Sequence, residues 1–333
     1  MGMTLMETKQ CKSAVEVQDL SFDAAEKQAL AQDWVAISMK QLSAGSYQGR
    51  IRQIDFENYR VVVEEQNQTI QKLGSMTDKY CTVSYAHIKE GGIRASEYRP
   101  DDNALFLMPG GTAFDVQILG NTEIVYFRFE QDYLMGQAQL LNPSAWAKMP
   151  EVPGPFDGVD RKPIEQAVSY LLHQYVAMQD SQSILGSKAI EQELHDLVLL
   201  ALVSGRHHNN DRKPGLKARR LVASRMDKVK EYIDAAHDAN QCPGIIDLCA
   251  QLNVSERTLQ YSFTKHLGVS PLAYLKIHRL NQVRAQLINP INMSDGVTTI
   301  AMRWHFWHMG QFSQDYKKMF NELPSATLKR ALS

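Results

Sequence analysis

The stretch of sequence that decides the fold is IIDLCAQLNVSERTLQYSF, residues 245–263. Apolar residues recur at helical spacing on both sides of Asn253, and Ser255 stands where a helix N-cap is expected. We therefore predict a short helix, a sharp turn at Asn253 and a second helix with Leu259 and Phe263 on its inner face. This is the layout of a helix-turn-helix, whose second helix can enter the major groove of DNA.

The same pattern of small, turn and buried positions recurs in TTIAMRWHFWHMGQFSQDY, residues 298–316. Ala301 takes the small position, His305 the turn, and Phe312 with Tyr316 the inner face of the second helix. Asn and His are among the residues that best tolerate a left-handed turn conformation. Because any helical hairpin can imitate one copy, two copies in register indicate DNA binding far more strongly than one.

The segment between the two units predicts a long helix over residues 271–288, with Pro271 in its first turn. A helix of that length spans about 27 Å. It could hold two recognition helices about 34 Å apart, which is one turn of DNA. We expect the remaining helices of this half at residues 226–236, 245–252, 255–266, 298–303 and 309–320.

Charge is distributed unevenly along the chain. The 333 residues carry a net charge of −1, but residues 206–333 hold 19 Lys and Arg against 10 Asp and Glu, a balance of +9. The preceding residues hold 17 against 27, a balance of −10. The polar run GRHHNNDRKPG at 205–215 predicts a linker between a sensor or dimerisation domain, 1–204, and a basic DNA-binding domain, 216–333.

The first half has two kinds of pattern. Short alternating or β-branched runs separated by Gly and Pro turns at 45–130 predict a small, cupin-like β-barrel or a sandwich. Apolar stripes predict helices at 160–204, and a looser spacing predicts another at 23–42. The expected fold class is α+β: a barrel with flanking helices, then an all-α domain with two helix-turn-helix motifs.

Several functional classes have no support. No run of about 18 uncharged apolar residues and no signal peptide occurs, so we predict a cytoplasmic, nucleoid-associated protein without membrane contact. The four cysteines lack disulfide or zinc spacing, and the histidines lack ligand spacing. Because neither a nucleotide-binding nor a nucleophile-elbow motif occurs, we predict no enzyme, no catalytic residue and no metal.

Residues 226–330 resemble the DNA-binding domain of the AraC/XylS transcription regulators. The matching stretches are VSERTLQ at 254–260, YLKIHRLN at 274–281, FWHMGQFSQDYK at 306–317 and Pro324-Ser325. Within that family the chain is similar to the ethanolamine-utilisation operon regulators, on DLC at 247–249 and PGGT at 109–112. His305 and Asn321 replace glycines usual in the family, and both residue types can occupy a left-handed turn.

The resemblance implies a bacterial regulator that binds promoter DNA, recruits RNA polymerase as an activator and forms a homodimer. It also implies a small-molecule effector, ethanolamine with adenosylcobalamin, and no other cofactor. Two alternatives stay open. One is an effector-free, quorum- or virulence-type regulator whose N-terminal domain only dimerises, and the other is an enzyme with its active site in the barrel.

Helical phase predicts which side chains face DNA, since the inner residues of each second helix are set by packing. Arg257 suits guanine and Gln260 suits adenine, while the alternative for each polar residue is an ordinary solvated helix face. The DNA-facing set is Arg257, Gln260, Tyr261 and Thr264 on the first recognition helix, and Met309, Gly310, Gln311, Ser313, Gln314 and Lys317 on the second. Nearby basic residues suit phosphate contacts or internal ion pairs: Lys276, Arg279, Arg284 and Lys318.

Aromatic side chains of the β region could line an effector pocket, although core packing is the more frequent role for any one of them. They are Tyr59, Tyr80, Tyr85, Phe106, Phe114, Tyr126 and Phe127. No single effector-binding residue is predicted.

Overall fold

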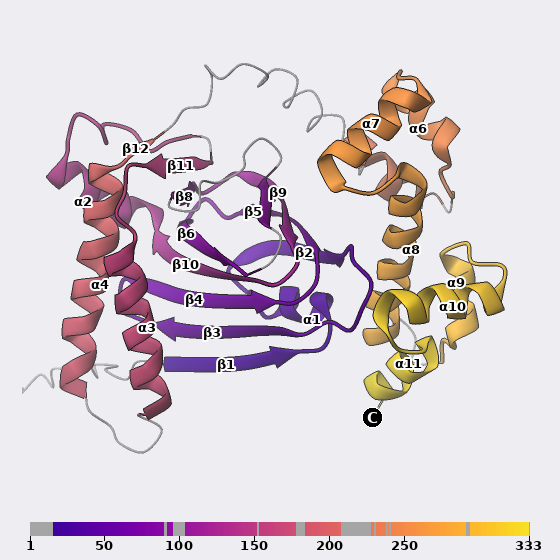
Figure 1. Cartoon of the computed structure of the whole chain (residues 1–333), viewed down its shortest axis with the longest axis horizontal. Helices are drawn as coiled ribbons and strands as arrows, with labels where there is room; N and C mark the ends of the chain where they lie inside the picture. The colour runs from indigo at the N-terminus through magenta and orange to yellow at the C-terminus, as the bar shows by residue number, and fades with distance from the viewer. Residues whose placement is uncertain are drawn as a thin grey trace, which may run out of the picture.

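The computed structural model describes residues 16–89, 92–95, 104–151, 153–177, 184–207, 228–229, 231–237, 239, 241–290 and 294–332. A β-rich domain with helices along one side is followed by an all-helical domain on the opposite side (Figure 1). This arrangement confirms the predicted fold class. Within the described ranges, no helix has both the length and the apolar character needed to cross a membrane.

The β region consists of two antiparallel sheets that do not close, so the predicted cupin-like barrel is wrong and the sandwich, the other form considered, is observed. The larger sheet has the order β1 (Glu16–Phe22), β3 (Gly49–Asp55), β4 (Tyr59–Gln66), β10 (Thr122–Glu130), β6 (Tyr80–Ile88), β8 (Leu105–Met108), β11 (Gly154–Asp157) and β12 (Arg206–His207). The smaller sheet has the order β2 (Val35–Gln41), β5 (Ile70–Met76), β9 (Ala113–Leu119) and β7 (Gly92–Ala95).

Helices cover the side of the large sheet away from the C-terminal domain (Figure 1). These are α2 (Gln131–Leu141), α3 (Lys162–Ala177) and α4 (Ile184–Ser204). Ile164 and Val168 of α3 and Leu194 and Val198 of α4 are at most 3% exposed and pack with sheet residues such as Phe127. The helices predicted at 160–204 are therefore confirmed, and they complete the main core of this domain.

The helix predicted over residues 23–42 is wrong. Only α1 (Ala25–Leu30) is helical there, and the chain then extends into β2. Leu30, one of the residues on which that prediction rested, is 70% exposed. The spacing of Leu30, Trp34 and Ile37 is helical, but pairing of β2 with β5 overrides so short a local pattern.

The C-terminal domain contains a helical segment at 231–237 and the helices α6 (Ile245–Leu252), α7 (Glu256–Leu267), α8 (Pro271–Ile288), α9 (Val297–Arg303), α10 (Met309–Phe320) and α11 (Pro324–Leu332). They form two separate apolar cores. Leu259, Phe263 and Tyr274 belong to the first, and Val283 and Phe312 to the second. Helix α8 contributes to both cores and so joins the two units into one body.

The predicted linker is only partly within the described residues. Arg206 and His207 form β12, which pairs with Asp157 and Phe156 of β11, so these two residues belong to the sheet and not to a linker. Residues 208–215 lie outside the described ranges. The predicted domain boundaries stay predictions.

Candidate nucleic-acid interface and effector pocket

Both turns have the left-handed backbone that the sequence predicts. Asn253 ends α6 with φ of 50°, and His305 follows α9 with φ of 61°. Ser255 caps α7, its hydroxyl accepting a hydrogen bond from the Thr258 amide at 3.3 Å. Asn321, which replaces a glycine of the family, also has a positive φ, 58°. Each helix pair is thus held at its helix-turn-helix angle by a residue type suited to that backbone.

Helix α7 is the first recognition helix. Its inner face is buried through Leu259 and Phe263, each at most 1% exposed. The predicted DNA-facing side chains Arg257, Gln260, Tyr261 and Thr264 are all exposed. Prediction missed Lys265, whose Nζ donates to the Tyr261 hydroxyl at 2.9 Å and lies 5.2 Å from its ring centroid. The four-residue spacing of an aromatic and a lysine on one helix was the available signal.

Helix α10 is the second recognition helix. Of the predicted residues, Gly310, Gln311, Gln314 and Lys317 are exposed, whereas Met309 and Ser313 are half-buried. Met309 packs against the second core, so it supports the helix from its flank. A Cβ built on Gly310 would meet no atom within 4 Å, which leaves the backbone open to an approaching surface.

Two residues at the start of α10 were missed. Trp307 is 64% exposed and His308 is exposed, although the turn immediately before them is ordered by His305. Both side chains extend the surface that α10 presents at its first turn. We predicted no role for either, because the pattern assigned only the turn at His305 and the inner face of α10.

Most of the nearby basic residues make contacts within the protein. Lys276 pairs with Asp315 at 2.9 Å, and the Arg279 guanidinium lies 5.0 Å from the Phe306 ring centroid. Arg284 is 3% exposed and pairs with Glu322 at 2.7 Å. Lys318 alone of the four is exposed without such a pair among the described residues. The internal-pair alternative therefore describes Lys276 and Arg284.

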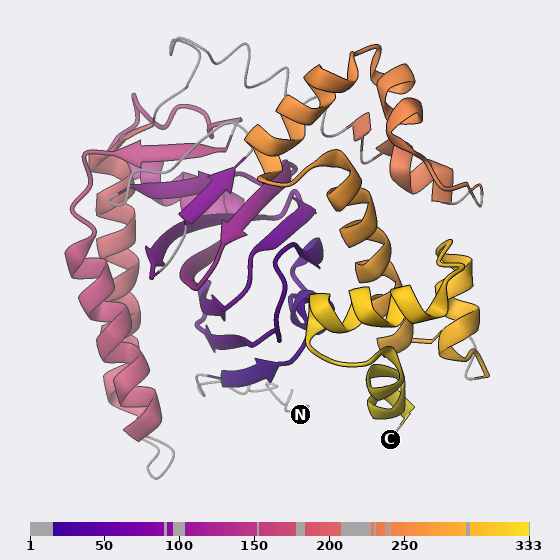
Figure 2. The same cartoon turned by 45° about the vertical axis from the view of Figure 1, so that its right-hand side comes forward.

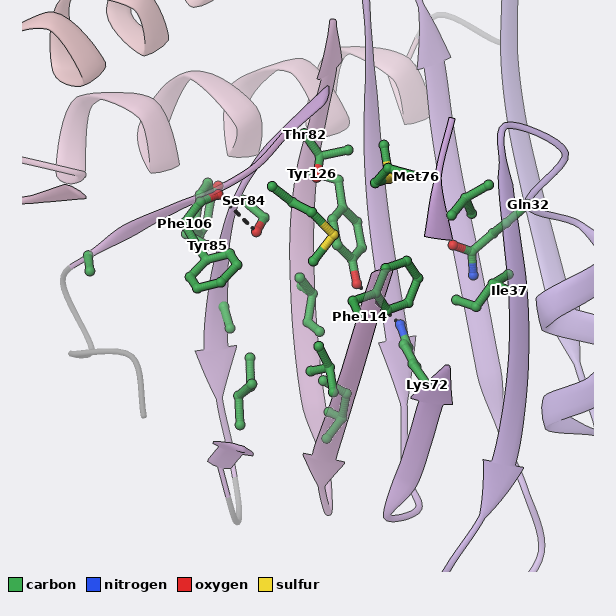
Figure 3. A pocket seen from close by; sticks show the side chains of 18 of the residues that line it. Gln32, Ile37, Lys72, Met76, Thr82, Ser84, Tyr85, Phe106, Phe114 and Tyr126 are labelled. Carbon is green, nitrogen blue, oxygen red and sulfur yellow. Dashed lines mark hydrogen bonds between the residues drawn. The ribbon is translucent and has the colours of Figure 1, made fainter. Parts of the chain in front are cut away.

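A cavity of about 950 Å³, its open mouth included, lies between the two sheets of the sandwich. The small sheet contributes Ile37, Lys72 and Phe114, and the large sheet contributes Phe106 and Tyr126 (Figure 3). A largely apolar lining with a few polar groups is typical of small-molecule sites. Of the seven aromatics considered from the sequence, Tyr85, Phe106, Phe114 and Tyr126 line this cavity. Tyr59 and Phe127 instead fill the main core, and Tyr80 packs beside the Arg128 guanidinium.

Lys72, which lines the cavity, belongs to a buried ion pair whose carboxylate lies behind the wall. The Lys72 ammonium contacts the Glu64 carboxylate, and the two side chains are 4% and 0% exposed. Lys72 also donates to the Tyr126 hydroxyl at 3.2 Å, and burial followed by the charge of Glu64 raises the pKa of that phenol well above its ordinary value. Sequence reasoning missed this pair, because Glu64 and Lys72 lie on different strands and nothing in the local pattern connects them.

Comparison with known proteins identifies the C-terminal helices. A helix-turn-helix domain model matches residues 248–330. The probable thc operon regulatory protein of Rhodococcus erythropolis is 37% identical over 99 residues, which cover 30% of this chain and 29% of that protein. The XylDLEGF operon transcriptional activator 2 of Pseudomonas putida is 40% identical over 75 residues, 22% of this chain and 48% of that protein.

Among solved structures, a probable AraC family transcriptional regulator from Rhodopseudomonas palustris is 33% identical. The match covers 32% of this chain and 97% of that chain, with a TM-score of 0.30. The chain carries an AraC-family helix-turn-helix domain. The chain spans less than half of the length of these two curated relatives.

The AraC-family domain is docked on the small sheet of the sandwich (Figure 2). Asn281 of α8 exchanges two hydrogen bonds with the backbone of Gln41, accepting from its amide at 2.8 Å and donating to its carbonyl at 2.9 Å. Because β2 is an edge strand of its sheet, this side chain occupies backbone groups that a further strand would otherwise pair.

Three more contacts join this sheet to the first helix-turn-helix unit. Gln117 Nε2 of β9 donates to the Leu267 carbonyl at the end of α7, at 2.8 Å. The Tyr274 hydroxyl donates to Gln71 of β5 at 3.1 Å. Lys40 Nζ lies 3.0 Å from His278 Nδ1, and burial, reinforced by the charge of Lys40, holds the pKa of His278 well below 6.5. A neutral His278 therefore accepts this hydrogen bond.

The second unit is docked through an ionic network. Arg284 donates to the Asp23 carbonyl at 3.1 Å, and its Nε lies 3.8 Å from Glu26 Oε2. Arg330 of α11 bridges Glu322 at 2.9 Å and Asp23 at 3.1 Å. Burial raises the pKa of Glu26 to about 7 although Arg284 opposes the shift, and neither carboxylate oxygen has a hydrogen-bond partner among the described residues.

Proposed function

We propose that this chain is a bacterial, cytoplasmic transcription regulator that reads promoter DNA with α7 and α10 and responds to a small molecule in the sandwich cavity. The observation that carries the proposal is the pair of helix-turn-helix units, each with a left-handed turn residue, a buried inner face and an exposed polar outer face. Helix α8 joins them rigidly, so one chain can present two reading helices to successive major grooves.

DNA binding is tested with the full chain and a labelled fragment of the region upstream of its own gene. Fluorescence anisotropy over a salt series should give an affinity that falls steeply as salt rises, because basic side chains release counterions from the phosphates. Lys317→Glu should weaken binding and flatten the salt dependence, since Lys317 is exposed on α10.

Lys188→Glu is the matched control, because Lys188 is exposed on α4 in the other domain and the net charge changes equally. It should bind as the unaltered chain does. Salt-independent binding, or equal losses in both variants, would contradict reading of DNA by α10.

Control by an effector is supported by the two faces of the small sheet. On β5 and β9, Lys72 and Val116 face the cavity, while their neighbours Gln71 and Gln117 bond to the AraC-family domain. Successive side chains of a strand point to opposite faces, so a ligand on one face is a single backbone layer away from α7 and α8. A ligand that repacks the cavity wall would therefore shift the docking contacts.

The finer parts of the proposal are activation through RNA polymerase and a homodimer. Exposed apolar side chains on the helical side of the N-terminal domain, Leu140, Tyr170 and Leu200, give the dimer a candidate surface. The alternative function is an effector-free regulator whose sandwich only dimerises. Dimerisation is measured by sedimentation of the full chain, and effector control by DNA affinity with and without ligand.

Ethanolamine with adenosylcobalamin remains the effector pair that the subfamily resemblance suggests. The cavity lends it little support. No carboxylate among the described residues lines the cavity to pair an ammonium group. Even with its open mouth included, the cavity has about 950 Å³ of empty space, which is less than a corrinoid occupies.

A further inference from the structure

The charges in the wall of the cavity are already balanced. Glu64 Oε1 accepts from Gln28 Nε2 at 2.8 Å and from Gln32 Nε2 at 3.2 Å, and Glu64 Oε2 contacts the Lys72 ammonium. This carboxylate is completely buried and fully hydrogen-bonded. The Glu64 carboxylate therefore neutralises the positive charge of Lys72, so this pair leaves no net charge for a ligand to balance.

The second basic residue of the lining is paired as well. Arg161 Nε contacts the Glu165 carboxylate one helical turn along α3, and its guanidinium lies 5.1 Å from the centroid of the Tyr85 ring. The Arg161 side chain is only 11% exposed. An anionic ligand would thus meet two cations that both already have a carboxylate partner, and a cationic ligand would meet no carboxylate at all.

Hydrogen-bond donors, in contrast, are left over. Trp34 lines the cavity and is 7% exposed, and its Nε1 has no hydrogen-bond partner among the described residues. Lys72 has three N–H groups, of which the described contacts to Glu64 and Tyr126 use two. Buried donors favour a ligand that brings an acceptor, because an unpaired buried N–H destabilises the complex.

We infer that the cavity takes a neutral, mainly apolar molecule that carries a carbonyl-type hydrogen-bond acceptor. A carboxylate or an ammonium would add one uncompensated charge to a buried site. Aromatic walls from Trp34, Phe106, Phe114 and Tyr126 favour a flat ring system in the apolar part. This inference rests on the proposed function, since it names the class of effector that the sandwich would sense.

The test uses four probes that share one naphthalene skeleton and differ in the end group: 2-acetylnaphthalene, 2-ethylnaphthalene, 2-naphthoate and 2-naphthylmethylamine. Their affinities for the full chain are measured by calorimetry at pH 7.5, where the acid and the amine are charged. The ketone should bind best, the ethyl compound about tenfold more weakly, and the charged probes at least about 100-fold more weakly. Tighter binding of the acid or the amine, or no binding by any probe, overturns the inference.

Two variants tie the preference to its cause. Trp34→Phe removes wall area for both probes, and it should weaken the ketone about fivefold more than the ethyl compound, because only the ketone uses the indole N–H. Trp146→Phe is the matched control, since Trp146 is also buried but stacks on Phe156 in the main core. Equal losses for ketone and ethyl compound in Trp34→Phe contradict the proposed hydrogen bond.

Glu64→Gln leaves Lys72 without its counter-charge. In this variant the naphthoate should gain at least about tenfold relative to the ketone, because the cavity now needs an anion. If this variant does not fold, the four-probe order and the Trp34→Phe result still decide the inference. DNA affinity measured in the same samples separates the two proposals. If the ketone binds without altering DNA affinity, the inferred cavity chemistry is supported and control by an effector is contradicted. If no probe binds while DNA binding is intact, only the cavity chemistry is contradicted.

Discussion

The first helix-turn-helix unit is docked on the N-terminal domain mainly by neutral contacts, whereas the second is docked by neutral hydrogen bonds together with an ionic network. Leu42 of the N-terminal domain is a buried member of the first unit's core, and Gln117 and Tyr274 add uncharged hydrogen bonds. Three neutral hydrogen bonds reach the second unit, two at the Met319 carbonyl and one from the Asn321 side chain to the Ser46 hydroxyl. Its ionic contacts belong to the network of Asp23, Glu26, Arg284, Glu322 and Arg330.

The difference teaches that two units of the same design can respond differently to conditions. Apolar contacts are little affected by pH and moderate salt, while contacts between charges depend on protonation and are screened. We therefore expect a rise in pH or in salt to loosen the second unit before the first. The four predictions below break or sharpen this comparison, from the largest expected effect to the smallest.

Leu42→Ala should lower the free energy of unfolding by about 2–5 kcal/mol, because it leaves a cavity in a well-packed core. The loss should fall on the first unit, so hydrogen exchange should accelerate in α7 and change little in α10. Leu30→Ala is the matched control, since Leu30 is 70% exposed in the same domain, and it should be almost neutral. Equal acceleration in α7 and α10 would show that the neutral contacts serve both units alike.

The second unit should weaken as pH rises. Burial raises the pKa of Glu26 from 4.5 to about 7, so the folded protein favours the protonated acid. That contribution to stability is complete below pH 4.5 and is lost as pH rises to about 7, a difference on the order of 3 kcal/mol. The pKa of His278 is lowered, so its contribution to stability has the opposite sign and is lost as pH falls below 6.5. Because His278 is present in every variant compared, this contribution cancels in the differences.

Glu26→Gln isolates this contribution. Between pH 5 and pH 7.5, the stability of the unaltered chain relative to Glu26→Gln should fall, as measured by chemical denaturation at each pH. Glu151→Gln, at an exposed site, should leave the corresponding difference flat. A constant difference for Glu26→Gln, or a rising one, would mean that the carboxyl group is ionised in the folded protein.

Each helix-turn-helix unit should contact bases at its own position in the operator. Arg257→Ala should cost about 1–3 kcal/mol in DNA affinity and relax the choice of base at one position. Gln314→Ala should do the same about one helical turn of DNA away, because it lies on the other recognition helix. Binding to a library of single-base operator variants measures both, with Lys188→Ala as the control. Uniform weakening across the library would make either residue a phosphate contact.

The turn residues should show the smallest effect. His305 has φ of 61°, a conformation that glycine adopts without strain. His305→Gly should therefore stabilise the second unit by up to about 1 kcal/mol, whereas His305→Ala should not. Asn253→Gly should gain less, since asparagine tolerates this conformation better. Thermal unfolding of the three variants checks this order, and an equal gain from His305→Ala would place the strain in the imidazole ring.

The C-terminal domain was predictable because its signals are local. Caps, turn residues and helical spacing lie within a few positions of one another, so the bounds of α6, α8 and α10 agree with those expected at 245–252, 271–288 and 309–320. The left-handed turns at Asn253 and His305 followed from the same patterns.

The N-terminal domain was less predictable because its decisive contacts are distant in sequence. Trp34 and Ile37 fitted a helix until pairing of β2 with β5 made them cavity residues. The pair of Glu64 with Lys72 and the docking of Gln41 on Asn281 depend on the tertiary arrangement. Four of the seven candidate aromatics reached the cavity, because strand register, which composition does not reveal, chooses the face of each side chain.

The small sheet has one further consequence, for how this protein can change over generations. On β9, Phe114, Val116 and Ile118 line the cavity, whereas Gln117 holds the end of α7. Neighbouring positions of β9 therefore affect separate properties, namely the lining of the cavity and the contact with α7. Substitutions at alternate positions can thus change which molecule the proposed effector site accepts while the contact of Gln117 with α7 is preserved.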